Sequence, residues 1–289
     1  ALVALARAYS FYKKIKIYYV LVDHNIRKDS GKESKKVKRL LKKNKIDLKI
    51  FKNKRIIVKN IQAEARDVRY EILLNYCKKH KIKVLITAHN LEDQVETFFM
   101  RLSRGSGLKG LSSMRTLTKM SHQVRLFRPL LDTKKNFLIK ISKSVFGTYF
   151  KDPSNDNHRF LRTKVRNLKR PLEKSGIKYD QIFRSIKNLS ISKDTLDQHF
   201  SKIFKDLIKK KKKEIFINYK KYSNLNKDTK IALINESIKQ LRNNYYDLRS
   251  KKVENLIKNF SNKNFKKSTL GGCIFFKKKG NLCLKPEKS

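Results

Sequence analysis

Residues 82–107, IKVLITAHNLEDQVETFFMRLSRGSG, combine a strand pattern, a helix pattern and a glycine-rich loop in one continuous stretch. The short apolar run at 82–89 predicts a buried strand, and residues 91–103 predict the helix that follows it. Asn90 is a good N-cap for that helix, with Asp93 three residues further on. A strand leading directly into a helix indicates an α/β fold, in which ligands bind beyond the carboxyl ends of parallel strands.

The predicted helix carries three carboxylates near its start, although acidic residues are scarce in this chain. The helix dipole stabilises first-turn acids such as Glu92 and Asp93 by ~0.3–1 kcal/mol each, which is a sufficient structural reason for them. Glu96 is harder to explain in this way, because Asp93 lies one turn away and like charges repel at this spacing. Asp93 and Glu96 share one helix face, where a carboxylate pair suits Mg²⁺ held together with substrate phosphates. The pattern alone leaves the structural and the functional interpretations open.

Further strands and helices alternate before this stretch. Residues 15–24 and 46–54 predict two more strands, and residues 33–45 and 61–81 predict two amphipathic helices. Strands separated by helices of this length predict right-handed βαβ units and a parallel sheet.

The second half of the chain has a different pattern. Residues 178–265 are predicted to be helical, with the lysine run 209–213 on a solvated helix face. The end of the chain predicts two short strands around the Lys-Gly-Asn turn at 279–281.

The chain is strongly basic, with 73 Lys and Arg against 24 Asp and Glu and a formal net charge of +49. This charge favours a polyanionic partner, whether RNA, DNA or an anionic membrane surface. Compositional drift in an A/T-rich coding sequence accounts for the general lysine excess equally well. No apolar run approaches the ~18 residues of a membrane span. The three cysteines form no C-x-x-C pair, which argues for reduced thiols in a cytosol.

The stretch TAHNLEDQVETFFMRLSRGSGLKGLSSM at 87–114 closely resembles the signature of the tRNA(Ile)-lysidine synthetases, which are PP-loop ATP pyrophosphatases. The resemblance continues in VDHNIRKDS (22–30), EARDVRYEIL (64–73), RPLL (128–131), DPSNDNHRFLRTKVRN (152–167) and TLGGC (269–273). It implies a Rossmann-like PP-loop catalytic domain over residues 1–170. It also implies a mostly helical tRNA-binding region over 171–289 that ends in a β-hairpin.

The resemblance implies a specific reaction. Enzymes of this family use ATP, with Mg²⁺, to adenylate the ring-position-two carbonyl of the wobble cytidine in the isoleucine tRNA with a CAU anticodon. The ε-amine of free L-lysine then displaces AMP and leaves lysidine. Activating a ring carbonyl in this way suits a metal-polarised phosphate, and the incoming amine needs a carboxylate and a base. A cytoplasmic enzyme, without a membrane partner and compatible with a homodimer, is expected.

The family's catalytic roles carry over onto the acidic helix. His89, Asp93 and Glu96 match the active-site helix of the family, and Asp93 and Glu96 are implied to face Mg²⁺-ATP or the lysine amine. Both are therefore expected metal ligands, and Asp93 an expected nucleotide contact. His24, at another strand end, is also a candidate for nucleotide binding, with a structural role as the alternative. For His89 the alternative is a neutral imidazole that caps the helix.

The family's basic residues carry over onto two other helices. Arg162 and Arg166 lie in the family's basic helix. Arg162 is the candidate for contact with nucleotide phosphates or the adenylate, with a general phosphate-positioning contact as the alternative. Arg166 is a candidate for substrate or tRNA binding. Arg66 and Arg69 match an arginine pair on the long helix and could reach phosphates or the RNA backbone. Pairing with acidic residues of the same helix is the alternative for this pair.

The glycine-rich loop after the acidic helix is expected to shape the wall that faces the tRNA. Glycine lets backbone N–H groups approach a phosphate closely. By the resemblance, Arg104, Gly105 and Gly107 belong to this wall.

One family motif does not occur in the sequence: the nucleotide loop S-G-G-x-D-S. The first residues, ALVALARAYS, resemble the helix that follows that loop, so we expect a truncated chain that has poor activity by itself. A non-catalytic RNA-binding homologue without the ATP site is the first alternative function. Another PP-loop tRNA modifier of the 2-thiolation type is the second, and the missing C-x-x-C pair weighs against it.

Overall fold

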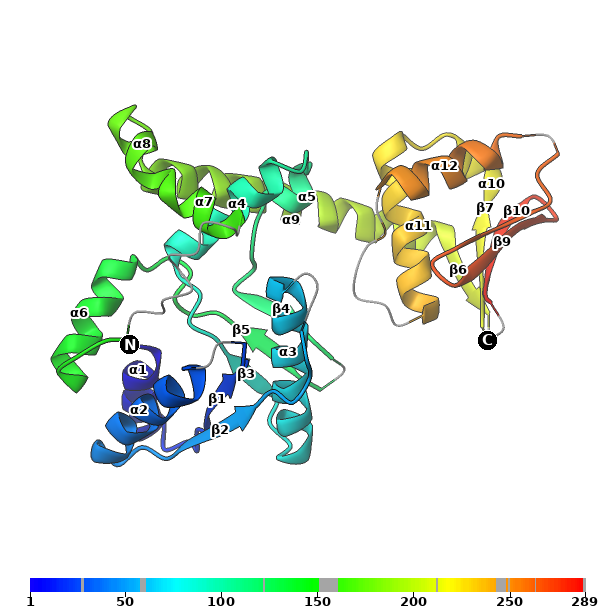
Figure 1. Cartoon of the computed structure of the whole chain (residues 1–289). Helices are drawn as coiled ribbons and strands as arrows, with labels where there is room; N and C mark the ends of the chain where they lie inside the picture. Colours follow the sequence, from blue (N-terminus) through cyan, green and yellow to red (C-terminus); the bar gives the residue numbers. More distant parts are fainter. Residues whose placement is uncertain are drawn as a thin grey trace. The chain divides into compact units, whose positions relative to one another are not determined.

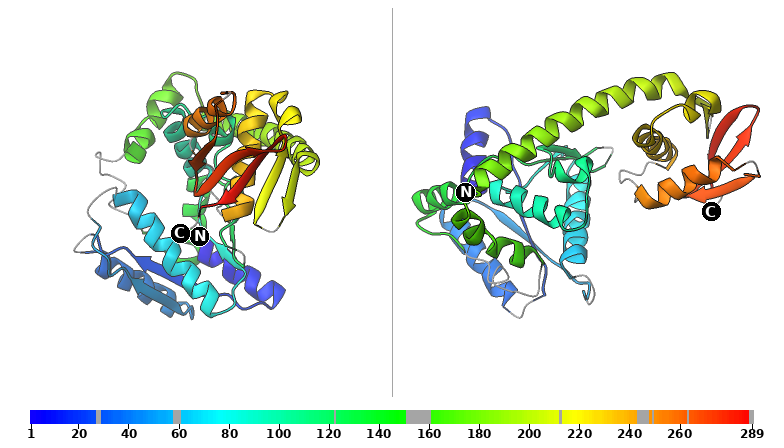
Figure 2. Two further views of the ribbon diagram at one scale, coloured as in Figure 1. Left: turned by 90° about the vertical axis from the view of Figure 1, so that its right-hand side faces the viewer. Right: turned by 90° about the horizontal axis from the view of Figure 1, so that it is seen from above.

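The computed structural model describes the chain except for residues 27–28, 58–60, 122, 151–160, 212, 243–247, 249, 263 and 288–289. It divides into two compact units, Ala1–Ser190 and Ile191–Ser289, which are drawn in Figures 1 and 2. Helix α9 (Tyr179–Leu207) begins in the first unit and ends in the second. No helix in the described part of the chain is long and apolar enough to cross a membrane.

Unit 1 alternates helices and short strands, as the sequence predicts. Its elements before α9 are α1 (Leu2–Lys13), β1 (Tyr19–Asp23), α2 (Ser30–Lys43), β2 (Leu48–Lys52), α3 (Ile61–Lys79), β3 (Val84–Ile86), α4 (Leu91–Leu102), α5 (Leu108–Leu111), β4 (Leu117–Lys119), β5 (Arg125–Phe127), α6 (Lys135–Phe146), α7 (Leu161–Asn167) and α8 (Lys169–Lys174).

The strands of unit 1 form two hydrogen-bonded groups. β1 and β2 pair in parallel, with Tyr19 opposite Leu48. β5 pairs in parallel with β3 and antiparallel with β4, so that β5 lies in the middle of a three-stranded sheet. Helices lie on both sides of these strands in the views of Figures 1 and 2. The predicted α/β fold with parallel strands and flanking helices is confirmed.

Helix α4 starts as its sequence predicts. The Asn90 side chain accepts a hydrogen bond from the Asp93 N–H, and the Asp93 carboxylate accepts one from the Asn90 N–H, each at 3.0 Å. Such a reciprocal capping box satisfies two N–H groups that a helix start otherwise leaves without partners. Leu91 and Val95 on this helix pack in the same buried cluster as Ile186 of α9. This packing fixes the side of α4 that carries Asp93.

Unit 2 combines helices with an antiparallel sheet. After the end of α9 its elements are β6 (Ile208–Lys211), β7 (Glu214–Asn218), α10 (Tyr219–Ser223), α11 (Lys227–Arg242), α12 (Ser250–Phe260), β8 (Lys267–Leu270), β9 (Cys273–Lys278) and β10 (Asn281–Pro286). The five strands lie in the order β6-β7-β10-β9-β8. Side chains of α11 and α12 and one face of the sheet form a single buried core.

The prediction that residues 178–265 are all helical is wrong at the lysine run. Lys209–Lys211 lie in strand β6, which pairs antiparallel with β7. Ile215 and Ile217 on β7 are fully buried and alternate with more exposed residues, which is the period of a strand. The partners of β7 include β10, more than 60 residues later in the sequence. Tertiary pairing therefore decides the structure of a lysine run that has no apolar periodicity of its own.

The predicted C-terminal hairpin is confirmed, and a second tight turn precedes it. β9 and β10 are joined by Lys279 and Gly280, which both have positive φ, as in the two-residue turns favoured between antiparallel strands. Gly271 and Gly272 make the equivalent connection between β8 and β9. A Cβ atom on Gly271 would lie 2.9 Å from Leu248 Cδ1. The segment TLGGC therefore needs glycine for a structural reason.

Candidate active site

The carboxylate of Glu96 is buried between two arginines of α7. Arg162 Nε donates to Glu96 Oε2 at 2.7 Å, and Arg166 donates to Oε1 at 2.6 Å and to Oε2 at 3.0 Å. Arg162 also donates from Nη2 to Asp93 Oδ1 at 2.6 Å. We call Asp93, Glu96, Arg162 and Arg166 the Glu96 cluster. Four of the residues singled out in the sequence are thus brought together, across almost 70 positions of chain.

The cluster depends on two helices that present their charged faces to each other. Asp93 and Glu96 are one turn apart on α4, and Arg162 and Arg166 are one turn apart on α7, which lies beside α4 (Figure 1). A buried carboxylate is tolerated only with such partners. Burial by itself lowers the pKa of Arg166, but the hydrogen bonds and charge of Glu96 outweigh this and raise that pKa.

Burial separates the two carboxylates of the cluster. Only 2% of the Glu96 side chain is exposed, against 21% of Asp93 and 32% of Arg162. Glu96 is therefore enclosed by guanidinium groups, and Asp93 and Arg162 present the accessible side of the cluster. The sequence left the division of roles between the two acids open.

The carboxylate pair does not by itself fit Mg²⁺ in this arrangement. All four carboxylate oxygens of Asp93 and Glu96 already accept a hydrogen bond. No group of three His, Cys, Asp or Glu side chains able to hold a metal is present in the described residues. An ion here would take most of its ligands from phosphates and water. The metal role of Asp93 and Glu96 stays a prediction, and no step is derived from it.

His89 lies where β3 ends and α4 begins, in a strongly positive environment. Its Nδ1 is 2.9 Å from the Thr87 hydroxyl oxygen. Burial lowers the pKa of His89 to about 3, and the positive charges of Arg128, Arg66, Arg69 and Arg162 act in the same direction. The imidazole is therefore neutral at physiological pH, and the site around it favours a negatively charged ligand.

We expect unit 1 to lose stability through His89 as the pH falls. The pKa of about 3 lies below the ordinary 6.5, so the folded state binds fewer protons than the unfolded state between these values. The contribution is complete above pH ~6.5 and is lost toward pH ~3, at no more than about 1.4 kcal/mol per pH unit. Urea unfolding at pH ~7.5 and ~5.5 should show a weaker pH dependence in His89→Asn than in the wild type. The exposed His199 provides the control His199→Asn, and equal pH dependence in all three proteins would contradict this prediction.

The arginine pair of α3 points at an aromatic ring instead of pairing with acids of its own helix. The guanidinium carbons of Arg66 and Arg69 lie 4.9 and 5.2 Å from the centre of the Tyr70 ring. Glu71 of the same helix binds Arg55 through both oxygens at 2.8 Å. Burial, with Arg66 and Arg162 nearby, lowers the pKa of Arg69. The positive charges of Arg66 and Arg69 also lower the pKa of His89, so the two arginines and His89 share one electropositive region.

The glycine-rich loop is shaped mainly by a residue that the sequence did not single out. Arg101 donates from Nη1 to the carbonyls of Gly110 at 2.6 Å and Ser113 at 3.0 Å. Arg104 is exposed, and Gly105 has a φ of +66°, which explains its glycine. Gly107 is the N-cap of α5 and would have open space around a Cβ atom. Contact of Arg104, Gly105 and Gly107 with tRNA stays a prediction.

Gln94 is a second residue that sequence reasoning missed. Its buried side-chain amide donates to the Met114 carbonyl and accepts from the Met114 N–H, both at 2.8 Å. The reciprocal pair closes the loop back onto α4. A glutamine between two acids gives no periodic signal, so only the structure shows this role.

His24 follows β1, and Asn53 donates to its backbone carbonyl at 3.2 Å. It therefore stands at the end of the β1–β2 pair, whereas His89 follows β3. Its contact with a nucleotide stays a prediction.

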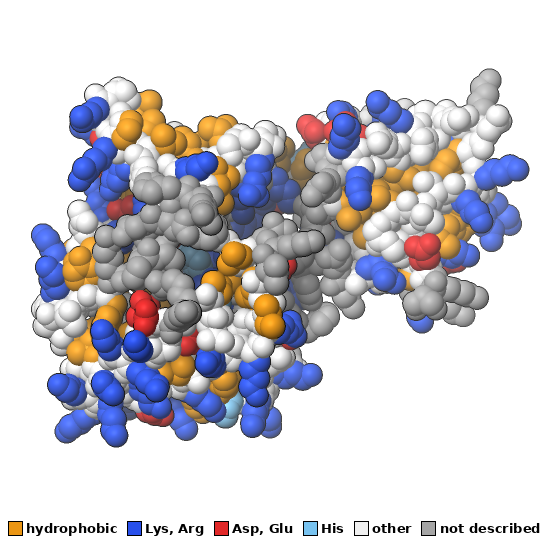
Figure 3. All heavy atoms as spheres, viewed as in Figure 1, with side chains coloured by type: hydrophobic (Ala, Val, Ile, Leu, Met, Phe, Trp, Pro, Cys, Tyr) orange, Lys and Arg blue, Asp and Glu red, His pale blue; other side chains and the backbone are white. Residues whose placement is uncertain are grey.

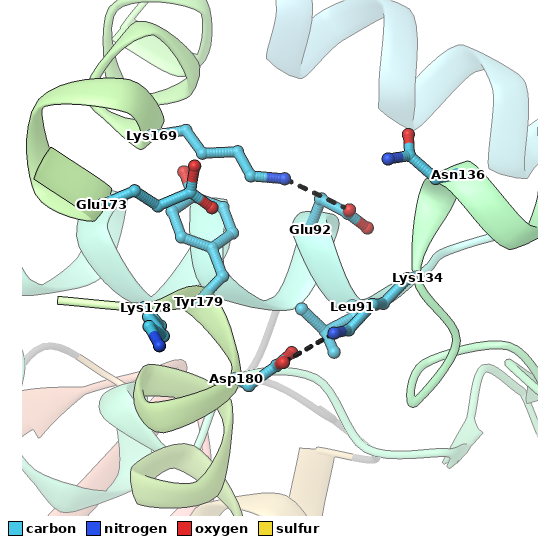
Figure 4. Close-up of a pocket in the computed structure, with 9 residues that line it drawn as sticks. All are labelled: Leu91, Glu92, Lys134, Asn136, Lys169, Glu173, Lys178, Tyr179 and Asp180. Atoms are coloured by element: carbon cyan, nitrogen blue, oxygen red, sulfur yellow. Dashed lines mark hydrogen bonds and ion pairs between the residues drawn. The ribbon is translucent and has the colours of Figure 1, made fainter. Parts of the chain in front are cut away.

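A cavity of about 350 Å³ lies on the Glu92 side of α4 (Figure 4). Among the residues that line it, Lys169 Nζ lies 3.6 Å from Glu92 Oε1. Lys134 Nζ donates a hydrogen bond to Asp180 Oδ2 at 2.6 Å. These ion pairs connect α4 with α8, and the start of α6 with α9. None of the catalytic candidates lines this cavity, so it is a feature separate from the Glu96 cluster.

Comparison with known protein families places these features. The sequence model of the PP-loop domain, an ATP-binding domain, matches residues 1–172, which include the whole Glu96 cluster. The chain belongs to the PP-loop family. This membership agrees with the parallel strands of unit 1 and with the site at the end of β3.

Two relatives of this PP-loop protein have the same enzyme name. It is 38% identical over 169 residues to the tRNA(Ile)-lysidine synthase of Orientia tsutsugamushi, covering 58% of the chain and 38% of the relative. With the enzyme of the same name from Rickettsia typhi it is 27% identical over 289 residues, covering 98% of the chain and 66% of the relative. The chain thus spans less than two thirds of the length of either relative.

Among solved structures, the U34-tRNA thiolase NcsA of Methanococcus maripaludis, with its 4Fe-4S cluster, resembles this PP-loop protein in fold. The TM-score is 0.51 at 20% sequence identity, over 65% of this chain and 68% of the thiolase. In this protein the three cysteines are buried and free, one in unit 1 and two in unit 2. The likeness therefore supports the fold.

Proposed function

We propose that this PP-loop protein acts as a tRNA(Ile)-lysidine synthase. It would use ATP to adenylate the wobble cytidine of the isoleucine tRNA with a CAU anticodon, and free L-lysine would then replace AMP. The observation that carries the proposal is the Glu96 cluster, which gathers the residues that match the family's active site beside the end of β3. The similarity to the Rickettsia typhi enzyme along 98% of the chain supports it.

The reaction balances in two steps. In the first, the ring carbonyl oxygen of the cytidine attacks the α-phosphorus of ATP, and pyrophosphate leaves. In the second, the lysine ε-amine attacks the ring carbon, and AMP leaves with the former carbonyl oxygen while the nitrogen loses a proton. The first step needs positive charge beside the phosphates. The second needs a carboxylate beside the incoming amine.

The described residues can supply both requirements. Arg162 and the arginines around His89 would stabilise the phosphate charges, in the way guanidinium groups commonly bind phosphate. Asp93 is the more accessible acid of the cluster and would attract the ammonium group and receive its proton. Glu96 would hold Arg162 and Arg166 in place, because it is too deeply buried to touch a substrate. Mg²⁺, if bound with ATP, would supply further charge at the phosphates.

The test is the formation of lysidine. Because S-G-G-x-D-S does not occur in the 289 residues, the assay compares the chain with a fusion in which a family strand and S-G-G-x-D-S loop precede Ala1. We expect AMP release only when ATP, lysine and the isoleucine tRNA are all present. Mass spectrometry should show one lysine condensed onto one cytidine. AMP release without tRNA, or another modified nucleoside, would overturn the proposal.

Unit 2 offers a surface for the RNA partner. Lys209, Phe216, Cys283, Phe276 and Lys267 stand opposite one another on successive strands of the sheet. In this row Cys283 is fully buried, Phe216 and Phe276 are half-buried, and the two lysines are exposed. Lysines with interleaved aromatic rings suit phosphates and stacked bases. Figure 3 shows many Lys and Arg side chains and few acidic ones on the face in view. We infer that this sheet face contacts tRNA.

Charge reversal at the edge of that sheet should weaken RNA binding. The variant Lys209→Glu/Lys211→Glu removes two phosphate contacts, so we expect weaker tRNA binding and a salt dependence of affinity shallower by about two units in a log–log plot. The control Lys251→Glu/Lys252→Glu makes the same charge change on helix α12. Filter binding at several salt concentrations measures both. Equal losses in the two variants would mean that only the net charge matters.

A further inference from the structure

Among the buried polar groups of unit 1 that lack a hydrogen-bond partner in the described residues, two are donors that lie near each other, the Tyr70 hydroxyl and Arg128 Nε. Tyr70 is 6% exposed and Arg128 is 5% exposed, and neither the Tyr70 hydroxyl nor Arg128 Nε has a partner among the described residues. Leaving such a group unpaired costs about 1–3 kcal/mol. Orphaned donors of this kind need a reason, and an absent ligand is one.

The rest of Arg128 is firmly held. Its Nη1 donates to the Arg115 carbonyl at 2.8 Å and to the Thr118 hydroxyl at 2.9 Å, and its backbone N–H donates to the Thr116 carbonyl. These bonds fix the guanidinium against β4 at the end of β5. The guanidinium is therefore held beside the Tyr70 hydroxyl, which stabilises its charge, and its Nε–H has no well-placed acceptor among the described residues.

The surroundings of Tyr70 are positive and can only donate. Arg66 and Arg69 lie over its ring. The hydroxyl oxygen of Tyr70 is close enough to Arg69 and Arg128 to accept from them, which leaves its own O–H without an acceptor among the described residues. Guanidinium groups carry no acceptor. Within the described ranges, no ion pair joins a carboxylate to Arg66, Arg69 or Arg128, in contrast to the arginines of the Glu96 cluster. Three positive charges are thus gathered with no carboxylate bound to them among the residues that the structure describes.

We propose that the Tyr70 hydroxyl and the Arg128 guanidinium bind a phosphate group, with Arg66 and Arg69 supplying additional charge. A phosphate has several acceptor oxygens and more than one negative charge, which matches two orphaned donors and three uncompensated arginines better than a carboxylate does. The proposal deepens the proposed function and rests on it only for the source of the phosphate. That source is either a nucleotide or the RNA backbone.

Tyr70→Phe separates this proposal from a structural role. The variant removes one buried O–H that has no acceptor among the described residues, and also an oxygen close to Arg69 and Arg128, so the free protein should change little in stability. The same variant should bind its phosphate ligand, whether inorganic pyrophosphate, ATP or RNA, about ten- to a hundredfold more weakly. The reason is that it loses a hydrogen bond to a charged group. Tyr76→Phe on the same helix is the control, since its hydroxyl is not among the buried orphans.

Arg128→Lys provides the second variant, and Arg125→Lys in β5, the strand that ends just before Arg128, is its control. Lysine keeps the charge and loses the fixed Nε–H, so we expect weaker phosphate binding from the first variant and unchanged binding from the second. Arg125 is exposed. Thermal unfolding of the 289-residue chain in each variant shows whether the fold is kept.

The ligands are inorganic pyrophosphate, ATP and an anticodon stem-loop RNA, each titrated by calorimetry into wild type and variants. Weaker pyrophosphate and ATP binding in Tyr70→Phe and Arg128→Lys indicates a nucleotide phosphate, and weaker RNA binding alone indicates a backbone phosphate. Unchanged affinity for all three ligands overturns the proposal, and so does a destabilised Tyr70→Phe with normal binding. If the fusion forms no lysidine but both variants bind the phosphate ligands more weakly, the proposed function is overturned and the phosphate site stands.

Discussion

Glu96→Ala is expected to destabilise unit 1 by about 3 kcal/mol, at the lower end of the 3–5 kcal/mol found when one partner of a buried ion pair is removed. The change leaves Arg162 and Arg166 without the carboxylate that binds both. Their side chains are 32% and 30% exposed, and solvent therefore screens part of the penalty. Urea unfolding followed by circular dichroism measures the free energy of unfolding. A signal that reports on α4 should be used, because a protein of two units need not unfold in one step.

Glu92→Ala is the matched control for this prediction. Glu92 lies on the same helix, and its partners are Lys169 at 3.6 Å and the Lys135 N–H at 2.9 Å. We expect a loss of only about 1 kcal/mol there. In the Glu96→Ala background, Arg166→Met should restore part of the stability, because it removes a half-buried positive charge that no longer binds the Glu96 carboxylate. Equal effects of Glu96→Ala and Glu92→Ala would show that Glu96 is not the centre of the cluster.

Asp93→Ala is expected to reduce lysidine formation by about 10²–10⁴-fold, the usual contribution of a positioned acid or base. The variant removes the accessible carboxylate beside Arg162 and also the capping bond to the Asn90 N–H. The lost cap should cost about 1 kcal/mol of stability, so the fold should survive. Single-turnover assays of the fusion with tRNA, ATP and lysine measure the rate.

Asp93→Asn distinguishes lost chemistry from a lost cap. Asparagine keeps a side-chain oxygen that can accept from Asn90 but carries no charge and is no base. We therefore expect near wild-type stability with a loss of activity similar to Asp93→Ala, and tRNA binding kept in both variants. An active Asp93→Asn would remove Asp93 from the chemistry. Tight tRNA binding in every variant, with no modification in the wild-type fusion, would favour the non-catalytic alternative.

Local features of the site could be predicted from the sequence because they depend on residues a few positions apart. The capping box of Asn90 and Asp93 and helix α4 follow from short-range chemistry. The two-residue turn at Lys279 and Gly280 is another case.

The partners of these features could not be predicted, because they come from distant parts of the chain. Nothing within one turn of Glu96 shows that two arginines of α7 enclose it, or that it is buried more deeply than Asp93. Arg128 gives no signal beyond a short family motif, and its missing acceptor is visible only in three dimensions. The lysine run became a strand because β7 and β10 pair beside it, which no local pattern of lysines can indicate.

Helix α9 has a consequence for the order in which the chain folds during synthesis. Starting a helix is the costly step, and lengthening it is comparatively easy. Residues such as Ile186 at its beginning join the core of unit 1, and Leu207 at its end joins the core of unit 2. The part made first by the ribosome therefore nucleates a helix that grows toward residues made later. The end of α9 is then the first secondary structure to form in unit 2.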